Sequence, residues 1–314
     1  MVVLKIMVTG ASGFVGTSLC NRLSSLGIKF SGTVRKKTRP EQFEIGELSA
    51  QTDWSEALTD CDVIIHLAAR VHVMKDTSHD PLAAFRAVNV DATLNLAKQA
   101  LRCGVKRFVY VSSVKVNGEE TISKSFTAFD VPAPIDPYGQ SKLEAEIELR
   151  ALLYQSGLEL VIIRPPLVYG PGVRANFFKL MQLVKMSVPL PLGAIHNKRS
   201  MVALDNLLDL LITCAHHPAA AGQIFMVSDD HDVSISELLR LLSSGMDQRS
   251  LLLPVPAWMI AGVATLMGKS ASANRLLGSL QVDIAHTKST LDWQPVVSMP
   301  DALRETVEHF LAHH

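Results

Sequence analysis

Residues 4–16 read LKIMVTGASGFVG and predict a strand, a glycine-rich turn and the start of a helix. An apolar run typical of a buried strand leads into Gly10, Gly13 and Gly16, and a helical pattern begins at Phe14. In such a unit the first glycine allows the turn, the second lets the backbone approach a pyrophosphate, and the third lets helix and strand pack closely. The amino terminus of the helix adds free N–H groups and partial positive charge. We expect a dinucleotide to bind Gly10, Gly13, Phe14, Val15 and Gly16.

The end of the next strand indicates which dinucleotide binds. An acidic residue about 20 positions after the glycines holds the ribose 2′-hydroxyl of NAD, whereas arginine there accommodates the 2′-phosphate of NADP. Arg35 lies 19 residues after Gly16 and is followed by Lys36, Lys37 and Arg39, with no acid in this run. We expect NADP(H), with Arg35 as the principal contact and Lys36 as the secondary one. A solvated basic loop is the alternative interpretation, and NAD(H) stays possible.

Short β-branched runs alternate with helical stretches through the first half of the chain. The runs are apolar along their whole length, as in parallel strands that helices cover on both faces. Gly27, Gly104 and Gly157 stand where helices should end, and Asp53–Glu56 and Asp136-Pro137 stand where helices should begin. The alternation predicts an α/β fold with a doubly wound parallel sheet of the Rossmann type. We place strands at Val3–Val8, Phe30–Arg35, Asp62–Ala68, Lys106–Ser112 and Leu158–Arg164, and helices at Phe14–Leu26, Trp54–Leu58, Pro81–Cys103 and Pro137–Ser156.

The pattern changes after about Gly170, where prolines and glycines cluster and the later segments become mostly helical. A capping box at Ser234–Glu237 precedes one helix, and Asp301–His313 has helical spacing. We expect a dinucleotide-binding domain over residues 1–170. A smaller, mostly helical substrate-binding domain should cover residues 171–314, with some segments returning to the sheet.

Leu251–Gly268, LLLPVPAWMIAGVATLMG, is apolar enough to raise the question of a membrane contact. Pro254 and Pro256 interrupt it, and the run from Ala257 to Met267 is shorter than the roughly 20 residues that a span needs. We therefore expect no membrane span and a helix packed inside a globular domain, with a membrane contact as the alternative.

Composition excludes several classes of protein. Lys+Arg and Asp+Glu both total 30, so the chain lacks the basic excess that a nucleic-acid-binding face would leave. The four cysteines lie far apart without zinc spacing and indicate reduced core thiols in a cytoplasmic protein. None of the 11 histidines has a convincing metal-ligand pattern, so no metal is expected, and His66 is interpreted as a hydrogen-bonded core residue.

Tyr138 and Lys142 form a YxxxK pattern on a helix expected to begin at Asp136-Pro137. Residues four apart share a helix face, and a nearby ammonium lowers the pKa of a phenol, which is otherwise near 10. Ser112 and Ser113 end the preceding strand, and ligands bind at the carboxyl ends of strands in open α/β sheets. A hydroxyl there could hydrogen-bond a reacting oxygen, whereas a surface Tyr and Lys on an amphipathic helix is the alternative.

Together these residues resemble the extended short-chain dehydrogenase/reductase family, especially its nucleotide-sugar epimerases and reductases. The shared motifs span essentially the whole chain: TGASGFVG (9–16), DVIIHLAA (62–69), NVDATL (89–94), RFVYVSS (107–113), DPYGQSK (136–142) and RPPLVYGPG (164–172). The resemblance implies a catalytic trio of Ser113, Tyr138 and Lys142, where Ser113 is chosen over Ser112 by its spacing to Val116-Asn117-Gly118. It also implies coenzyme contacts from Leu67, Ala68, Ala69 and Pro165, besides Tyr138 and Lys142.

The same resemblance implies how substrate binds. Asn176 matches an asparagine at a helix start that meets the nucleotide diphosphate, and Arg199 matches a phosphate-binding arginine. Arg275 is the nearest candidate for a second such arginine. With Ser113 and Tyr138 these residues would bind a UDP-sugar. A homodimer is also expected from the resemblance.

Three reactions share this scaffold. Sugar dehydratases carry an Asp-Glu pair after the catalytic hydroxyl, where this chain has Val114 and Lys115, so a dehydratase is not expected. Epimerases retain NAD and usually end the second strand in an acid. Residues 70–81, 112–121 and 276–283 resemble bacterial 4-ketoreductases that make UDP-N-acetylquinovosamine or UDP-N-acetylfucosamine for surface polysaccharide such as O-antigen. The expected reaction is therefore NADPH-dependent reduction of the C4 ketone of a UDP-linked 4-keto-6-deoxy-N-acetylhexosamine. A UDP-hexose or UDP-N-acetylhexosamine 4-epimerase with tightly bound NAD is the alternative, and a non-catalytic nucleotide sensor is a more distant one.

Overall fold

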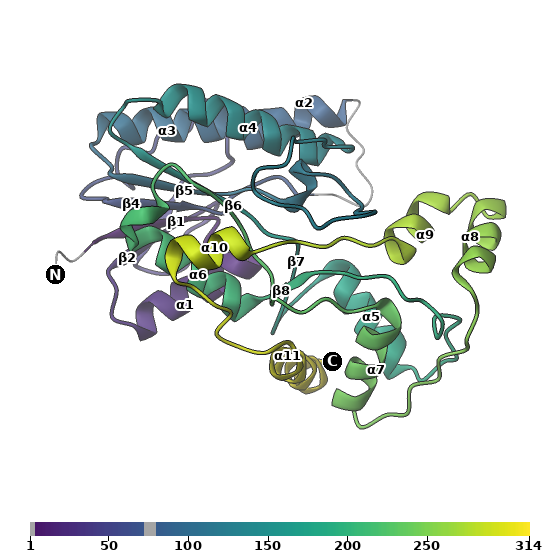
Figure 1. Ribbon diagram of the computed structural model, residues 1–314. Helices are drawn as coiled ribbons and strands as arrows, with labels where there is room; N and C mark the ends of the chain where they lie inside the picture. Colours follow the sequence, from purple (N-terminus) through teal and green to yellow (C-terminus); the bar gives the residue numbers. More distant parts are fainter. Residues whose placement is uncertain (1–3, 72–79) are drawn as a thin grey trace.

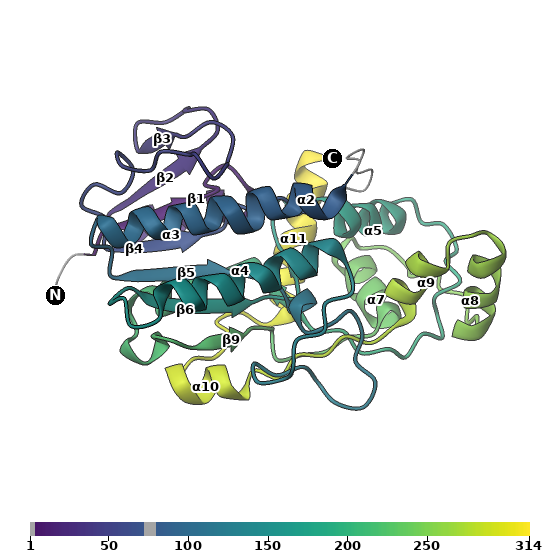
Figure 2. The same cartoon turned by 90° about the horizontal axis from the view of Figure 1, so that it is seen from above.

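A seven-stranded parallel sheet forms the centre of the computed structural model, which describes residues 4–71 and 80–314 (Figures 1 and 2). Every pair of neighbouring strands is parallel, and the spatial order is β3-β2-β1-β4-β5-β6-β9. This order reverses direction between β1 and β4, which is the point where doubly wound sheets bind ligands. The strands are β1 (Ile6–Thr9), β2 (Phe30–Val34), β3 (Gln42–Glu44), β4 (Val63–His66), β5 (Arg107–Val111), β6 (Glu159–Arg164) and β9 (Ile224–Met226).

Helices cover both faces of the sheet (Figure 1). One face packs against α1 (Phe14–Ser25) and α6 (Leu204–His216), with α10 (Ala285–Leu291) and the short η3 (Pro218–Ala220) beside β9. The other face packs against α3 (Ala92–Arg102) and α4 (Pro137–Leu153). Because both faces are covered, β1 and β4 are buried along their whole length, which explains their unbroken apolar sequences.

The predicted doubly wound fold is confirmed. Each predicted strand is present to within two residues at the ends that the structure describes; Val3, where the first was expected to begin, lies outside the described residues, as does most of the 70–81 stretch. The helix predicted over Pro81–Cys103 is divided into α2 (Pro81–Arg86), a π-helical turn η1 (Ala87–Asp91) and α3. The helix predicted at Trp54–Leu58 is wrong, because the segment forms only turns. There the Asp53 carboxylate accepts hydrogen bonds from the backbone N–H and hydroxyl of Ser55.

Residues beyond Gly170 form a second hydrophobic cluster beside the sheet. It lies among α5 (Ala175–Lys185), α7 (Ile235–Gly245) and α11 (Met299–His313), next to a small parallel pair of β7 (Leu167–Tyr169) and β8 (Met201–Ala203). The Ser234 hydroxyl caps α7 as predicted. This part of the chain also contributes α6 and β9 to the main sheet. A domain boundary at residue 170 stays a prediction.

The apolar helix α8 (Ala257–Leu266) forms close to where it was expected, but its predicted burial is wrong. None of its residues is buried, and it projects with α9 (Ser270–Leu277) at the end of the molecule away from the sheet (Figures 1 and 2). Within residues 4–71 and 80–314, no helix has the length and apolar composition that crossing a bilayer requires. Of the cysteines, Cys20, Cys61 and Cys214 are buried as expected, whereas Cys103 is exposed.

A buried ion pair ties α4 to the end of β6. The Arg164 guanidinium donates to both carboxylate oxygens of Glu146, at 3.0 and 2.5 Å, and to Asn117 Oδ1 at 3.1 Å. The side chains of Arg164 and Glu146 are each only 3% exposed, so water cannot replace either partner. Breaking such a pair from one side leaves a charge buried without compensation.

We expect Arg164→Leu to lower the free energy of unfolding by about 3–5 kcal/mol, because Glu146 would stay buried and unpaired. The double variant Arg164→Leu/Glu146→Leu should lose less, since it buries no charge. Urea denaturation measures both values. Arg304→Leu is the matched control, because it breaks the exposed Arg304–Asp301 pair and should cost less than about 1 kcal/mol. Equal losses in Arg164→Leu and Arg304→Leu would contradict this assignment.

Candidate active site

The glycine loop makes a close crossing between β1 and α1. Gly10 has a φ of +67°, and a Cβ there would lie 3.0 Å from the backbone of Ala68. A Cβ on Gly16 would lie 2.1 Å from the carbonyl oxygen of Gly10, so only glycine lets α1 start this close to the strand. Gly13 is the N-cap of α1 and has no side chain to occupy the helix terminus. The terminus therefore presents backbone N–H groups toward an anion.

Thr9 fastens the turns after β1 and β4 to each other. Its hydroxyl accepts hydrogen bonds from the N–H groups of Leu67 and Ala68, both at 3.1 Å, and contacts His66 Nδ1 at 2.8 Å. The other ring nitrogen of His66 contacts the hydroxyl of Thr93 at 3.0 Å. Burial, with the nearby Lys142 charge, lowers the pKa of His66 to about 3, so this residue is a neutral core histidine. Thr9 was not singled out in the sequence, although it directly precedes the glycine loop.

A cavity of about 660 Å³ runs from the glycine loop to the start of α4. It gathers predicted coenzyme and catalytic residues from the ends of β1, β2, β4, β5 and β6, as expected for a switch-point site. Those that line it are Gly10, Gly13, Phe14, Val15, Gly16, Arg35, Leu67, Ala68, Ala69, Ser113, Tyr138, Lys142 and Pro165. Lys36 is exposed and is not among the described lining residues. A larger hollow of about 740 Å³, between the end of α4 and β9, contains none of the predicted site residues in its described lining.

Two opposite charges stand at the β2 end of the cavity. Arg35 Nη1 lies 3.4 Å from Glu47 Oε1, and both side chains are mostly exposed. Both residues line the cavity. The sequence argument considered only acids near the end of β2, whereas Glu47 reaches this place from the segment after β3 (Gln42–Glu44).

Tyr138 and Ser113 meet at the other end of the cavity. The Ser113 hydroxyl accepts from the N–H of Lys115 at 3.3 Å. Burial and the negative charge of Asp136 raise the pKa of Tyr138 to about 12, and the nearby Ser113 hydroxyl partly offsets this. The hydroxyl of Ser112 is buried and has no partner among the described residues.

Lys142 lines the same end of the cavity, but it does not lower the pKa of Tyr138 as expected. Its ammonium donates to the carbonyl of Val111 at 2.9 Å and lies 4.7 Å from the centre of the Tyr110 ring. Burial lowers the pKa of Lys142 to about 7, against the opposing charge of Glu146. We expected Lys142 to lower the pKa of Tyr138. The pKa of Tyr138 is instead raised, because burial and Asp136 outweigh the favourable contacts.

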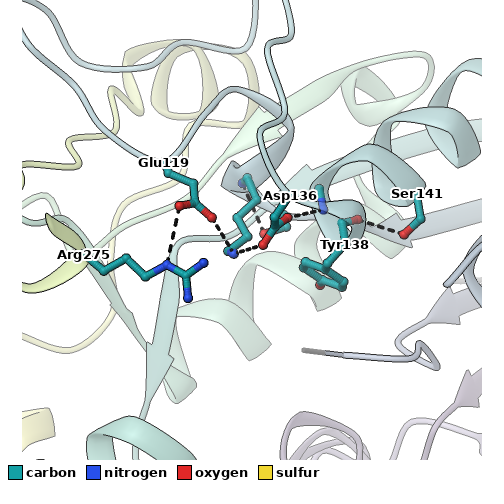
Figure 3. A network of polar contacts seen from close by, with 8 residues as sticks. Glu119, Asp136, Tyr138, Ser141 and Arg275 are labelled. Carbon is teal, nitrogen blue, oxygen red and sulfur yellow. Dashed lines mark hydrogen bonds and ion pairs between the residues drawn. The ribbon is translucent and has the colours of Figure 1, made fainter. Parts of the chain in front are cut away.

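A chain of charges surrounds the start of α4 (Figure 3). Asp136 caps the helix by accepting from the N–H of Gly139 at 2.7 Å, and its other oxygen binds the ammonium of Lys115. Lys115 also pairs with Glu119 at 2.9 Å, and Glu119 pairs with Arg275 of α9 at 3.5 Å. The network places a cation beside the carboxylate whose charge raises the pKa of Tyr138. Lys115, considered in the sequence as evidence against a dehydratase, is thus held by two carboxylates.

The π-helical turn η1 places Asn89 against the same helix. Asn89 is 1% exposed; its amide donates to the hydroxyl of Ser141 at 3.0 Å and exchanges hydrogen bonds with the backbone of Arg70. Ser141 donates in turn to the carbonyl of Tyr138 at 2.8 Å. Asn89 therefore links the loop after β4, which lines the cavity, to α4, the helix that carries Tyr138 and Lys142. No spacing pattern in the sequence indicates the π turn, which inserts one residue into an otherwise regular helix.

Of the five predicted substrate contacts, Ser113 and Tyr138 line this cavity, whereas Asn176, Arg199 and Arg275 lie outside its described lining. Arg199 donates to the carbonyl oxygens of Arg275 and Gly278, at 2.8 and 3.0 Å, so it holds the end of α9. Burial lowers the pKa of Arg199. Asn176 is exposed on the first turn of α5. The structure therefore brings Arg199 and Arg275 together and leaves Asn176 apart on another helix.

These features fit a nicotinamide dinucleotide. At Gly10 and Gly16 there is no room for a side chain, so the start of α1 lies close to the strand. The cavity extends from this loop to the start of α4, and the buried Ser112 hydroxyl, which has no partner among the described residues, lines it. No set of three His, Cys, Asp or Glu side chains among the described residues is grouped as a metal site would require.

Comparisons with known proteins agree with this geometry. The chain is 48% identical to UDP-glucose 4-epimerase of Vibrio cholerae over 98% of this chain and 95% of that protein. It is 29% identical to N-acetyl-alpha-D-glucosaminyl-diphospho-ditrans,octacis-undecaprenol 4-epimerase of Escherichia coli O157:H7, over 82% of this chain and 78% of the relative. The structure of MoeE5 in complex with UDP-glucose and NAD matches with a TM-score of 0.79 at 22% identity, covering 98% and 99% of the two chains, which shows a shared fold. A family model matches residues 6–228, and the chain belongs to the NAD dependent epimerase/dehydratase family.

Proposed function

We propose that the protein is a nucleotide-sugar 4-epimerase that keeps NAD bound through turnover. The observation that carries this proposal is the convergence of Ser113, Tyr138 and Lys142 at one end of a cavity that begins at the glycine loop. The 48% identity to a protein named UDP-glucose 4-epimerase favours epimerisation over net reduction.

Each residue then has a defined task. The bound dinucleotide supplies a hydride acceptor and donor for C4 of the sugar. Tyr138 takes the proton of the 4-hydroxyl while C4 is oxidised and returns it when C4 is reduced. The Ser113 hydroxyl, which already contacts Tyr138, hydrogen-bonds the same sugar oxygen. Lys142 binds the nicotinamide ribose through its ammonium, whose pKa a bound anion would raise from about 7.

NADPH-dependent 4-ketoreduction is the second candidate, because one observation favours it. Arg35 stands at the end of β2, where a 2′-phosphate would be recognised, and no acid precedes it there. The same Tyr138 would then donate a proton to a ketone oxygen, and the coenzyme would be exchanged in each turnover.

The proposed substrate carries a diphosphate. The proposed contacts are Arg199, whose guanidinium binds the backbone at the end of α9, Arg275, which pairs with Glu119, and Asn176 on α5. UDP is the proposed carrier. The Escherichia coli relative is named for a sugar on an undecaprenyl diphosphate. Both carriers contain a diphosphate, which is the group proposed to bind Arg199 and Arg275. The homodimer stays a prediction.

Coenzyme content separates the two reactions. We expect purified protein to release NAD on denaturation and to interconvert UDP-GlcNAc and UDP-GalNAc, or UDP-glucose and UDP-galactose, without added coenzyme, as followed by NMR. Tyr138→Phe should retain the coenzyme and lose at least roughly 100-fold in turnover, because proton transfer is lost. Protein that binds no NAD, and instead oxidises NADPH with the 4-keto-6-deoxy product of UDP-GlcNAc, would establish the reductase.

The charges around Tyr138 predict opposite shifts in pH dependence. If the phenolate accepts the proton, kcat/KM rises with pH below the pKa of Tyr138, which Asp136 raises. Asp136→Asn keeps a capping oxygen and removes the charge, so this limb should move to lower pH by about one unit. Lys115→Met leaves Asp136 without its cation, so the limb should move to higher pH by a similar amount. Shifts of the same sign in both variants would contradict the assignment.

The paired charges at the β2 end predict coenzyme preference. Arg35→Ala should weaken NADPH binding roughly tenfold or more and leave NADH nearly unchanged, because it removes a charge-assisted contact to phosphate. Glu47→Ala should weaken NADH binding by a similar factor, if its carboxylate accepts from the ribose hydroxyls. Fluorescence titration of the apoprotein with each reduced coenzyme measures both. Equal losses for the two coenzymes in Arg35→Ala would remove the support for the reductase.

A further inference from the structure

Helix α8 exposes an apolar surface that the proposed reaction does not use. Its most exposed side chains are Trp258 at 74%, Val263 at 57% and Leu266 at 90%, and Met267 follows directly at 61%. Leu251 and Leu253, on the segment that leads into the helix, are also about half exposed. Exposed apolar patches of this kind mark contacts with proteins or membranes.

Hydrogen bonds and packing contacts hold α8 and the segment that precedes it in place. Backbone hydrogen bonds join Leu190 to Leu251 and Leu253, and Gly193 to Leu253. Ile260 packs at the edge of the C-terminal hydrophobic cluster, and α8 contacts α9. Helix α8 therefore projects from an ordered support (Figure 1).

Composition around α8 indicates what covers it. Residues 250–268 contain no charged side chain, and Arg249 and Lys269 stand at the two ends of this stretch, both exposed. Residues 248–282 contain no Asp or Glu and are flanked by Asp247 and Asp283; within this stretch Arg275 pairs with Glu119. Neither Arg249 nor Lys269 forms an ion pair within the described part of the chain. Basic residues beside apolar ones complement the anionic headgroups of a bilayer surface.

The length of α8 fits a bilayer surface as well. Its ten residues are apolar except for Thr265; Ile260, Ala261 and Ala264 are half-buried, whereas Trp258, Met259, Val263 and Leu266 are exposed. A run of 10–14 apolar residues that is not buried has the length of an interfacial segment, and Trp258 suits the headgroup level.

We propose that α8 lies in the surface layer of an anionic phospholipid bilayer, with Trp258, Val263, Leu266 and Met267 inserted and Arg249 and Lys269 at the headgroups. The contact is peripheral and reversible, since the inserted segment is short. It does not depend on the reaction assigned above.

Tryptophan fluorescence and vesicle flotation test this proposal. The chain has three tryptophans, and Trp54 and Trp293 are 0% and 4% exposed, so only Trp258 can report on lipid. With vesicles of phosphatidylcholine and phosphatidylglycerol we expect flotation and a blue shift of emission, both weaker on pure phosphatidylcholine and at high salt. Brominated acyl chains should quench the shifted emission.

Variants locate the contact. Leu266→Ser and Val263→Ser should each weaken vesicle binding roughly tenfold, the loss expected when one buried aliphatic side chain is removed. Arg249→Gln/Lys269→Gln should abolish the preference for anionic vesicles. Leu26→Ser is the control, because Leu26 is 51% exposed and lies at the end of α1 opposite to the glycine loop, on a different helix from the proposed contact. All variants should keep coenzyme content and turnover.

Three results would overturn the proposal. One is a wild-type protein that neither floats nor shifts its emission with either vesicle. Another is an equal loss of vesicle binding in Leu26→Ser. The third is a lipid-free dimer that Val263→Ser converts to a monomer, because a second copy of the chain would then cover α8. None of these results bears on the epimerase assay, so failure of one proposal is distinguishable from failure of the other.

Discussion

The position of α4 depends on a buried ion pair, and the site depends on α4. Arg164 holds Glu146, which lies one helical turn after Lys142 and two after Tyr138, so both side chains point to the ends of the strands. Asp136 fixes the start of the helix, and Asn89 fixes its first turn through Ser141. Three contacts from different parts of the chain therefore set one helix. Burying both charges costs desolvation energy, and the pair fixes α4 in a single orientation.

Local patterns were enough to predict most of the sheet. Strands buried on both faces must be apolar throughout, and Gly27, Gly104 and Gly157 all adopt positive φ after helices, so these features are visible in short windows of sequence. The failures have physical causes. Residues 54–58 are too few for a stable helix, and the Asp53 side chain stabilises a turn instead. The exposure of α8 was not predictable from its composition, because an apolar helix is ordinarily buried in protein and only the tertiary fold shows whether a partner helix is present.

Some residues of the candidate site could likewise be predicted from the sequence, and others could not. The glycine loop, Ser113, Tyr138 and Lys142 were found because each belongs to a motif that is contiguous or has helical spacing. Glu47 and Thr9 were missed because their contacts arise only when separate segments of the chain meet, and so does the contact of Lys115 with Asp136 at the start of α4. The pKa of Tyr138 shows why spacing alone misleads. A lysine four residues away predicts a lowered value, but the balance is decided by burial and by Asp136, two residues before the phenol.

Epimerisation and ketoreduction place the same demands on Tyr138, Ser113 and Lys142, so the choice between them lies in how long the coenzyme stays. Arg35 and Glu47 are 75% and 85% exposed, so water and salt screen their charges. They are suited to select between a ribose hydroxyl and a phosphate. The proposed epimerase, which keeps NAD bound, would need further contacts in the enclosed part of the cavity, where the glycine loop and the start of α1 offer backbone N–H groups to phosphates. A basic end of β2 is therefore compatible with the proposed epimerase.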